Sequence, residues 1–195
     1  YGAKDDKVKM DRYLKISQQE LAHLANMIEK VLQLDIDEVK GLVMQSSKVN
    51  VITLLEDVME LSKLGAQKSV NFNFTYTEDP IVVAADVAHL KNVFSNLFDN
   101  AIKYSKGSVQ IDITLFKRKD TVVVEIKDYG IGIASNYLGD IFEMFFRVPN
   151  GELHPVKGFG LGLAYVKQVM VQHGGSIQVR SELGKETVFI LTLPQ

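Results

Sequence analysis

The chain has 195 residues, of which 46% are hydrophobic and 24% are charged, and its formal net charge is −2. This composition is that of an ordinary globular protein of one or two domains, with no general electrostatic attraction to nucleic acid or anionic lipid. The absence of cysteine excludes disulfides and thiolate metal sites, and no apolar run of about 18 residues predicts a membrane span.

The N-terminal part predicts one amphipathic helix over residues 8–34. Leu14, Leu21 and Ile28 are spaced by seven, and a second apolar stripe adjoins them. One such stripe cannot bury itself, so we expect a partner helix from upstream sequence or from a second chain. Packing against the following domain is the alternative. The polar stretch up to residue 48 predicts the end of the helix and a linker.

The rest of the chain predicts helices interleaved with strands. Apolar residues at helical spacing predict helices over 51–64, 86–104 and 164–172, and Asp86 is a suitable N-cap for the second of these. Alternating or short apolar runs predict strands over 70–77, 81–84, 109–116, 121–127, 176–181 and 187–193. We therefore expect an α/β domain after the N-terminal helix.

Glycines are concentrated between residues 130 and 162. Gly158, Gly160 and Gly162 come just before the predicted helix 164–172. Glycines at a helix N-terminus form an anion site, because unpaired N–H groups and the helix dipole both favour phosphate. The spacing is GxGxG rather than the dinucleotide fingerprint GxGxxG, and the chain has no Walker-type motif. The run therefore predicts a nucleotide pocket of another type, with simple tight turns as the alternative.

One face of the predicted helix 86–104 carries four polar side chains: Asn96, Asn100, Lys103 and Tyr104. Their neighbours are apolar, and buried polar groups need partners. Either the amides cap a neighbouring loop, or their carbonyl oxygens hold Mg²⁺ while the lysine meets phosphate. The glycine run favours the second interpretation.

Four ordered motifs in this part resemble those of sensor histidine kinases. They are NLFDNAIKYS at 96–105 (N box), DYGIG at 128–132 (G1 box), IFEMFFR at 141–147 (F box) and GFGLGL at 158–163 (G2 box). The N-terminal helix further resembles the second helix of the dimerisation and phosphoacceptor hairpin. The resemblance divides the chain into that partial hairpin (1–39), a linker (40–49) and a catalytic ATP-binding domain (50–195).

The resemblance implies a Bergerat-type fold, an α/β two-layer sandwich with helices on one face of a mixed sheet and a mobile lid at about 134–157. It implies ATP and Mg²⁺ as cofactors, with Asn100 as the metal ligand. Asn96 would lie by the phosphates and Lys103 would contact one of them. Together with Arg147, a γ-phosphate contact, these two residues would carry the catalytic roles.

The same resemblance implies how the nucleotide is bound. Tyr104 would pack by the adenine, and Asp128 would accept a hydrogen from its amino group. The main chain of the G1 box would run close beside the base. The main chain of the G2 box would surround the phosphates with its N–H groups. The residues concerned are Gly130, Gly132, Ile133, Gly158, Gly160, Leu161, Gly162 and Leu163.

Some positions depart from the family pattern. Met144 stands where the F box usually has Pro, and Glu186 replaces the usual small residue of the last turn. The phosphoacceptor motif is absent, because no histidine is followed by an acidic residue and a Thr/Asn-Pro pair. We expect structural roles for the four histidines of this chain: His23, His89, His154 and His173. The chain should then bind ATP without labelling itself.

The implied function is transfer of the ATP γ-phosphoryl to a histidine of a dimeric hairpin, and from there to a response-regulator receiver domain. Three alternatives stay open: a hydrolytic ATPase of the same superfamily, a protein-serine kinase of the anti-sigma type, and a nucleotide-gated binding module. The hydrolytic enzymes have glutamate at the position of Asn96. We expect a cytoplasmic location, a homodimer in the full-length protein, and neither nucleic-acid nor membrane contact. Because residue 1 is Tyr, we expect a fragment whose anchor or sensor lies upstream.

Overall fold

The computed structural model describes residues 9–10, 13–14, 17, 44–149 and 159–195, and divides into two compact units, Tyr1–Val43 and Met44–Gln195. In the first unit the described residues are helical, and Met10, Tyr13 and Leu14 are exposed. The greater part of the predicted helix 8–34 lies outside the described residues, so the dimerisation helix stays a prediction. None of the described helices is both long and apolar enough to cross a membrane.

The second unit interleaves helices and strands. Its described elements are, in chain order, β1 (Ser47–Asn50), α2 (Val51–Gly65), β2 (Val70–Tyr76), β3 (Val82–Ala85), α3 (Val87–Lys103), β4 (Val109–Arg118), β5 (Thr121–Asp128), the 3₁₀ helix η1 (Ser135–Tyr137), α4 (Gly162–Gln172), β6 (Ser176–Glu182) and β7 (Glu186–Pro194). The three predicted helices and six predicted strands of this unit are confirmed.

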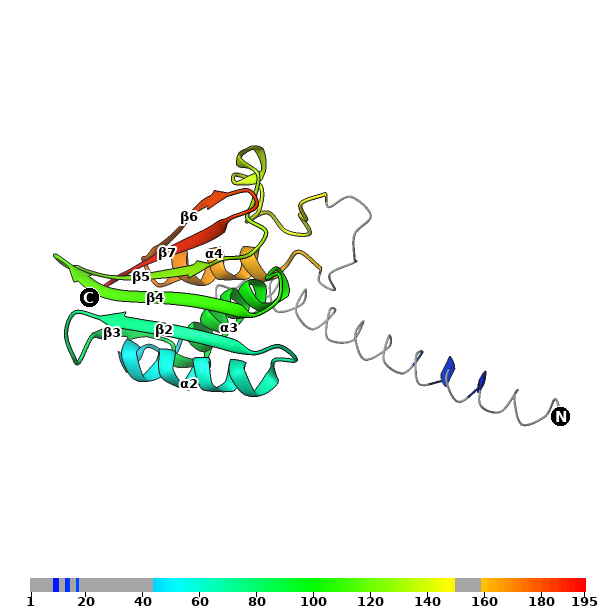
Figure 1. Ribbon diagram of the computed structural model, residues 1–195. Coiled ribbons are helices and arrows are strands. Elements are labelled where there is room, and N and C mark those ends of the chain that lie inside the picture. Colours follow the sequence, from blue (N-terminus) through cyan, green and yellow to red (C-terminus); the bar gives the residue numbers. More distant parts are fainter. Residues whose placement is uncertain (1–8, 11–12, 15–16, 18–43, 150–158) are drawn as a thin grey trace. The chain divides into compact units, whose positions relative to one another are not determined.

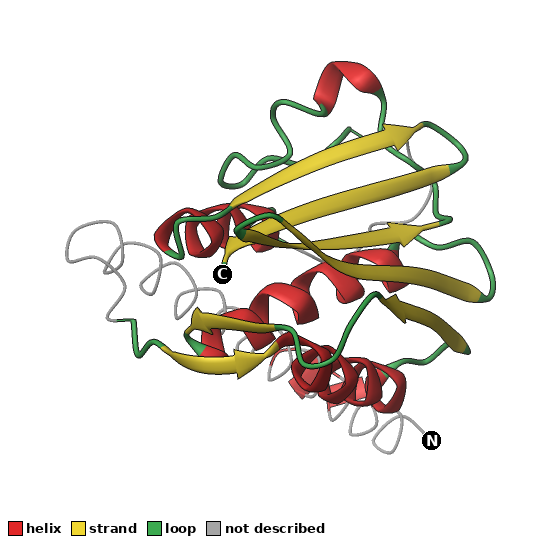
Figure 2. Ribbon diagram, turned by 90° about the vertical axis from the view of Figure 1, so that its left-hand side faces the viewer, coloured by secondary structure: helices red, strands yellow, loops and turns green. Residues whose placement is uncertain are grey.

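Five strands form one mixed sheet in the order β2-β4-β5-β7-β6. β2 runs parallel to β4, and the other neighbours are antiparallel. β1 and β3 form a separate antiparallel pair. Helices α2, α3 and α4 cover one face of the large sheet and leave the other open (Figures 1 and 2). The expected α/β two-layer sandwich, with a mixed sheet and helices on one face, is confirmed.

The core lies between α3 and the sheet. Residues of α3 at helical spacing are at most 1% exposed: Leu90, Val93, Phe94, Leu97 and Phe98. Alternate residues of β4 face them and are fully buried: Ile111, Ile113 and Leu115. Full burial of one such side chain contributes about 1.5–3 kcal/mol. This apolar contact fixes the helix that carries the predicted polar face.

Helix α3 begins where the sequence predicts. The Asp86 Oδ1 atom accepts hydrogen bonds from the backbone N–H groups of Ala88 (2.9 Å) and His89 (3.1 Å), which satisfies two of the unpaired donors of the first turn. Its Oδ2 atom accepts the N–H of Gln45 at 2.9 Å. Burial raises the pKa of Asp86, but the hydrogen bonds from His89 and Gln45 outweigh it and lower the pKa.

Two boundaries differ from the sequence prediction. Strand β1 begins inside the stretch expected to be a linker (40–49), and the compact unit already begins at Met44. Its four residues are held by pairing with β3, which no local pattern reveals. The β4–β5 hairpin also has a tighter turn than expected, because Arg118 still pairs with Thr121 and Lys119 turns the chain with a φ of 55°.

Candidate functional site

The polar face of α3 is partly exposed. Asn96 and Asn100 are half-buried, whereas Lys103 is exposed with its Nζ atom 4.0 Å from Asp99 Oδ2. The Asn96 Nδ2 group donates to the carbonyl of Asn92 at 2.8 Å, which orients the carboxamide; within the described part of the chain its Oδ1 atom accepts no hydrogen bond. Among the described residues, the Asn100 carboxamide has no hydrogen-bond partner, so its oxygen is available to a ligand.

The start of α4 lies against Asn96. A Cβ atom on Gly162 would come within 2.8 Å of Asn96 Oδ1, so only glycine leaves the carboxamide this close to the helix. The N-cap residue, Leu161, provides no side-chain cap. The first N–H groups of a helix lack intrahelical partners and, with the helix dipole, bind anions. The structure thus brings the N box and the end of the G2 box together at the N-terminus of α4.

Gly160 joins the G2 box to the F box. It adopts a φ of 73°, and a Cβ there would lie 2.5 Å from the carbonyl oxygen of Phe146. Its own carbonyl accepts the N–H of Phe145 at 3.1 Å. Arg147 is exposed close to the end of this described stretch, and Gly158 lies outside the described residues. Their phosphate contacts therefore stay predictions.

Asp128 is the buried carboxyl group of the site, with 7% of the residue exposed. Its Oδ1 atom accepts the N–H of Gly130 at 2.9 Å. Burial raises the pKa of Asp128 to about 6; the Gly130 hydrogen bond opposes this rise and the charge of Glu186 adds to it. The Asp128 carboxyl group is thus a hydrogen-bond acceptor that is largely shielded from water.

The G1 turn packs on the end of α3. The N–H of Ile131 donates to the carbonyl of Tyr104 at 3.1 Å. A Cβ on Gly130 would lie 2.8 Å from that same carbonyl oxygen and 2.8 Å from Asp128 Oδ1. Only glycine permits this approach, which places the Tyr104 carbonyl and the Asp128 carboxyl beside the same residue of the turn.

The β6–β7 hairpin holds the other side of the G1 turn. A Cβ on Gly132, where φ is 64°, would lie 2.1 Å from the carbonyl oxygen of Glu182. The N–H of Ile133 donates to Ser181 Oγ at 2.8 Å, and that hydroxyl lies 3.0 Å from the Thr187 hydroxyl. Sequence reasoning missed Ser181 and Thr187, because a hydroxyl in a strand carries no signal of the loop it will meet.

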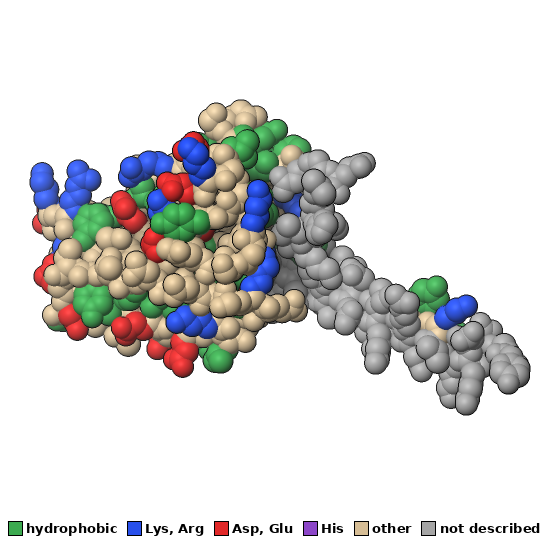
Figure 3. Space-filling view, viewed as in Figure 1, with side chains coloured by type: hydrophobic (Ala, Val, Ile, Leu, Met, Phe, Trp, Pro, Cys, Tyr) green, Lys and Arg blue, Asp and Glu red, His purple; other side chains and the backbone are tan. Residues whose placement is uncertain are grey.

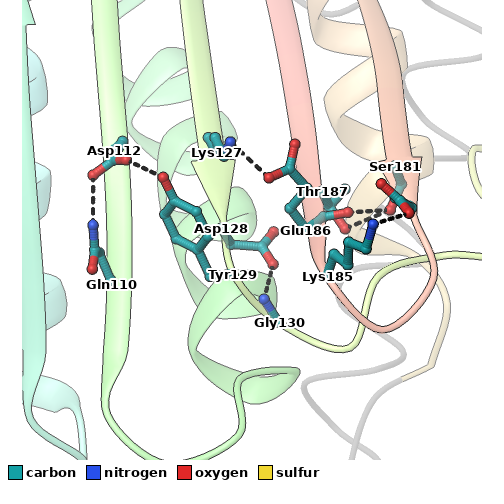
Figure 4. A network of polar contacts seen from close by, with 11 residues as sticks. Gln110, Asp112, Lys127, Asp128, Tyr129, Gly130, Ser181, Lys185, Glu186 and Thr187 are labelled. Atoms are coloured by element: carbon teal, nitrogen blue, oxygen red, sulfur yellow. Dashed lines mark hydrogen bonds and ion pairs between the residues drawn. The ribbon is translucent and has the colours of Figure 1, made fainter.

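A second polar network lies on the open face of the sheet at the same strand ends (Figure 4). Tyr129 Oη donates to Asp112 Oδ2 at 2.6 Å, and Lys127 Nζ lies 2.7 Å from Glu186 Oε2. The hydrogen bond to Glu186 raises the pKa of Lys127. Figure 3 shows cationic and acidic side chains interspersed on this side of the molecule. The network links β4, β5 and β7 beside the strand end that carries Asp128.

The donor set suits a magnesium ion shared with phosphates. Within the described part of the chain, no three His, Cys, Asp or Glu side chains are grouped to hold a metal. Magnesium in phosphate-transfer sites takes one or two protein oxygens and completes its shell with substrate phosphates and water. The Asn100 amide oxygen, on the next turn of α3 from Asn96, fits such a role.

Comparison with known proteins gives a consistent result. Residues 85–195 match the family of histidine kinase-, DNA gyrase B-, and HSP90-like ATPases. The sensor protein RprX of Bacteroides fragilis (strain YCH46) is 35% identical over 180 residues, which are 90% of this chain and 34% of that protein. The chain spans about a third of the length of the curated relatives it matches.

Solved structures share the fold. The catalytic domain of the histidine kinase ThkA superposes with a TM-score of 0.68 at 28% identity, over 77% of this chain and 98% of that one. Full-length ShkA in complex with AMPPNP gives a TM-score of 0.79 at 25% identity, over 95% of this chain and 39% of that one.

Proposed function

Because this chain belongs to the family of histidine kinase-, DNA gyrase B-, and HSP90-like ATPases, as the ATP-binding domain of a sensor histidine kinase, we propose that it binds ATP with Mg²⁺ and donates the γ-phosphoryl group to a histidine. That histidine would lie on a dimerisation hairpin and would pass the phosphoryl to a response-regulator receiver domain. The full-length protein would be a homodimer through the hairpin.

The convergence of two glycine-mediated approaches carries the proposal. Gly162 brings the α4 terminus to Asn96, Gly130 brings the G1 turn to Tyr104, and each approach leaves no room for a Cβ. The first places an anion-binding terminus beside the amide face of α3, and the second places a buried carboxyl at its C-terminal end. Triphosphate and base would occupy these two places.

The base end would select adenine. The Asp128 carboxylate would accept a hydrogen from the adenine amino group, and its burial strengthens the bond by excluding competing water. Guanine presents a carbonyl oxygen at the equivalent ring position, which a carboxylate repels. Tyr104 would pack by the ring, and the backbone of Gly132 and Ile133 would pass its edge.

The phosphate end would work by positioning and charge neutralisation, which dominate phosphoryl transfer. The first N–H groups of α4, beginning at Gly162 and Leu163, would bind phosphate oxygens with Gly160 and Leu161 shaping the approach. Lys103 would supply a cation. Asn100 would hold Mg²⁺, which neutralises phosphate charge when bound. Asn96 would orient the phosphates through its fixed carboxamide.

Hydrolysis is the disfavoured alternative. Activation of water requires a group that accepts a proton, and an amide cannot do so at neutral pH. In this chain the Asn96 amide nitrogen already donates to the carbonyl of Asn92. The residue is therefore suited to holding phosphates rather than to taking a proton.

The test uses γ-labelled ATP, this chain and a separately produced hairpin segment carrying the phosphoacceptor histidine. We expect an acid-labile label on the hairpin, lost when Asn100 is replaced by alanine in this chain. Binding of ATP without any label would instead support a nucleotide-gated module, and release of free phosphate without label would support a hydrolase.

A further inference from the structure

His173 lies at the opposite end of α4 from Gly162, and only 9% of it is exposed. Its Nε2 atom is 3.0 Å from the backbone nitrogen of Asp86, 87 residues away in sequence. Its Nδ1 atom is 2.8 Å from the carbonyl oxygen of Val169. Both ring nitrogens of this buried histidine are thus within hydrogen-bond distance of the main chain.

The two partners fix the tautomer. A carbonyl oxygen only accepts, so Nδ1 carries the hydrogen and donates it to Val169. Nε2 is then the acceptor for the N–H of Asp86. The neutral ring thereby satisfies a main-chain donor that Asp86, as an N-cap outside the helix, leaves without a partner in α3.

Asp86 in turn connects to a third segment. Its carboxylate caps the first turn of α3 and also accepts the N–H of Gln45, which precedes β1. The His173–Asp86 contact therefore joins the last turn of α4, the first turn of α3 and the chain entering the domain.

Helices α3 and α4 run antiparallel with contacts at three levels. His173 meets Asp86 at one end, the His89 Nδ1 atom lies 2.8 Å from Tyr165 Oη between them, and Gly162 approaches Asn96 at the other end. Helix α4 has 11 residues and is thus about 16 Å long. A helix of that length is stiff, so a displacement of its C-terminal end also moves its N-terminal N–H groups.

We propose that His173 is a positioning residue for the triphosphate. Its bond to the Asp86 N–H sets the axial position of α4 against α3 and thereby holds the Gly162 turn beside Asn96. This inference rests on the proposed function, in which ATP phosphates lie at that turn. Asp128, on β5, is on a different element, so the base end of the site does not depend on His173.

Two substitutions of His173 test its hydrogen bonds to Asp86 and to Val169 separately. In His173→Gln the side-chain amide places an acceptor where Nε2 lies and keeps the bond to Asp86. In His173→Asn the shorter amide keeps a donor for Val169 but cannot reach Asp86. Gln172→Asn, at the exposed neighbouring position, is the matched control.

Affinities for ATP and AMP would be measured by calorimetry in Mg²⁺. We expect His173→Asn to lose about five- to tenfold in ATP affinity, the equivalent of about one buried hydrogen bond, with AMP affinity unchanged. His173→Gln should keep most of the ATP affinity, and Gln172→Asn all of it. Equal losses for ATP and AMP, or lower thermal stability with both affinities intact, would overturn the positioning role.

A second measurement needs no variant. Coupling between two sites is reciprocal, so phosphate binding at the start of α4 should stabilise the bond at its other end. We expect slower hydrogen exchange of the Asp86 amide with ATP than with AMP. Equal exchange under both nucleotides contradicts the inference alone. A wild-type chain that binds no ATP contradicts the proposed function and the inference together.

Discussion

Asn96 on α3 and Gly162 on α4 approach so closely that a methyl group on Gly162 would lie 2.8 Å from the Asn96 Oδ1 atom. Gly162→Ala should therefore displace the carboxamide and weaken ATP binding by about tenfold, the cost of roughly one polar contact. The fold should persist, because the clash is with a side-chain end and not with backbone. Calorimetry and thermal unfolding of the variant check both expectations.

The matched control is the double variant Gly162→Ala with Asn96→Ala, which removes the clashing atom. The unfolding temperature of the double variant should equal that of Asn96→Ala alone. A Gly162→Ala chain that binds ATP as well as wild type would show that phosphates do not lie at this helix terminus.

The buried carboxyl of Asp128 predicts a pH-dependent stability. Its pKa in the folded state is about 6, raised from 3.8 mainly by burial. The folded state therefore binds the proton more tightly than the unfolded chain, and this group's contribution to stability falls as the pH rises from about 4 to about 6. Above that window the cost levels off at about 3 kcal/mol at most.

Asp128→Asn removes the titration but keeps an acceptor for the Gly130 N–H. We expect its free energy of unfolding to exceed that of wild type at pH 8 and the difference to shrink toward pH 4, by urea denaturation at each pH. Asp120→Asn, at the exposed hairpin tip, should show no such trend. A difference independent of pH would mean that Asp128 is not the titrating group.

The Lys127–Glu186 ion pair on the open face of the sheet should affect the pKa of Asp128. Glu186 raises the pKa of Asp128 by its charge, and Lys127 lies 2.7 Å from that glutamate. Lys127→Met leaves the charge of Glu186 uncompensated, so the Asp128 pKa should rise above about 6. Carboxyl NMR titration measures it directly.

Arg180→Met is the matched control for that titration. Arg180 pairs at 3.9 Å with Glu125 on the same sheet. Its loss removes one cation but leaves the ion pair between Lys127 and Glu186 in place. Equal changes in the Asp128 pKa in the two variants would mean that the loss of any nearby positive charge causes the change, and not the loss of the Lys127–Glu186 pair in particular.

The proposed metal role of Asn100 predicts a loss specific to magnesium. Asn100→Ala should weaken ATP binding in Mg²⁺ by about ten- to a hundredfold, the range for a lost metal ligand or its support. Without Mg²⁺ its affinity should equal that of wild type. Asn92→Ala, at an exposed position about two turns earlier on the same helix, is the control, and equal Mg²⁺ dependence in both variants would refute the role.

The sequence predicted those helices and strands whose buried apolar residues recur at a regular spacing. Helix α3 and its cap at Asp86 follow from apolar spacing and one capping residue, and both are local properties. Strand β1 escaped prediction because four residues offer too short a pattern and are fixed by pairing with β3.

The site was predicted as a set of motifs rather than as a set of contacts. The resemblance to sensor histidine kinases implied that Asn96 and Gly162 lie by the same phosphates, and the structure brings the two residues together. The supporting contacts of Ser181 and His173 depend on packing between segments far apart in the chain. No local pattern encodes such pairs, so only the three-dimensional structure reveals them.

The most direct test of the nucleotide site compares ATP and GTP binding to the wild-type chain by calorimetry in Mg²⁺. With Asp128 accepting the adenine amino hydrogen, ATP should bind at least about tenfold more tightly than GTP, since a mismatched buried acceptor costs about 1–3 kcal/mol. Equal affinities for the two nucleotides, or no binding of either, would contradict the account.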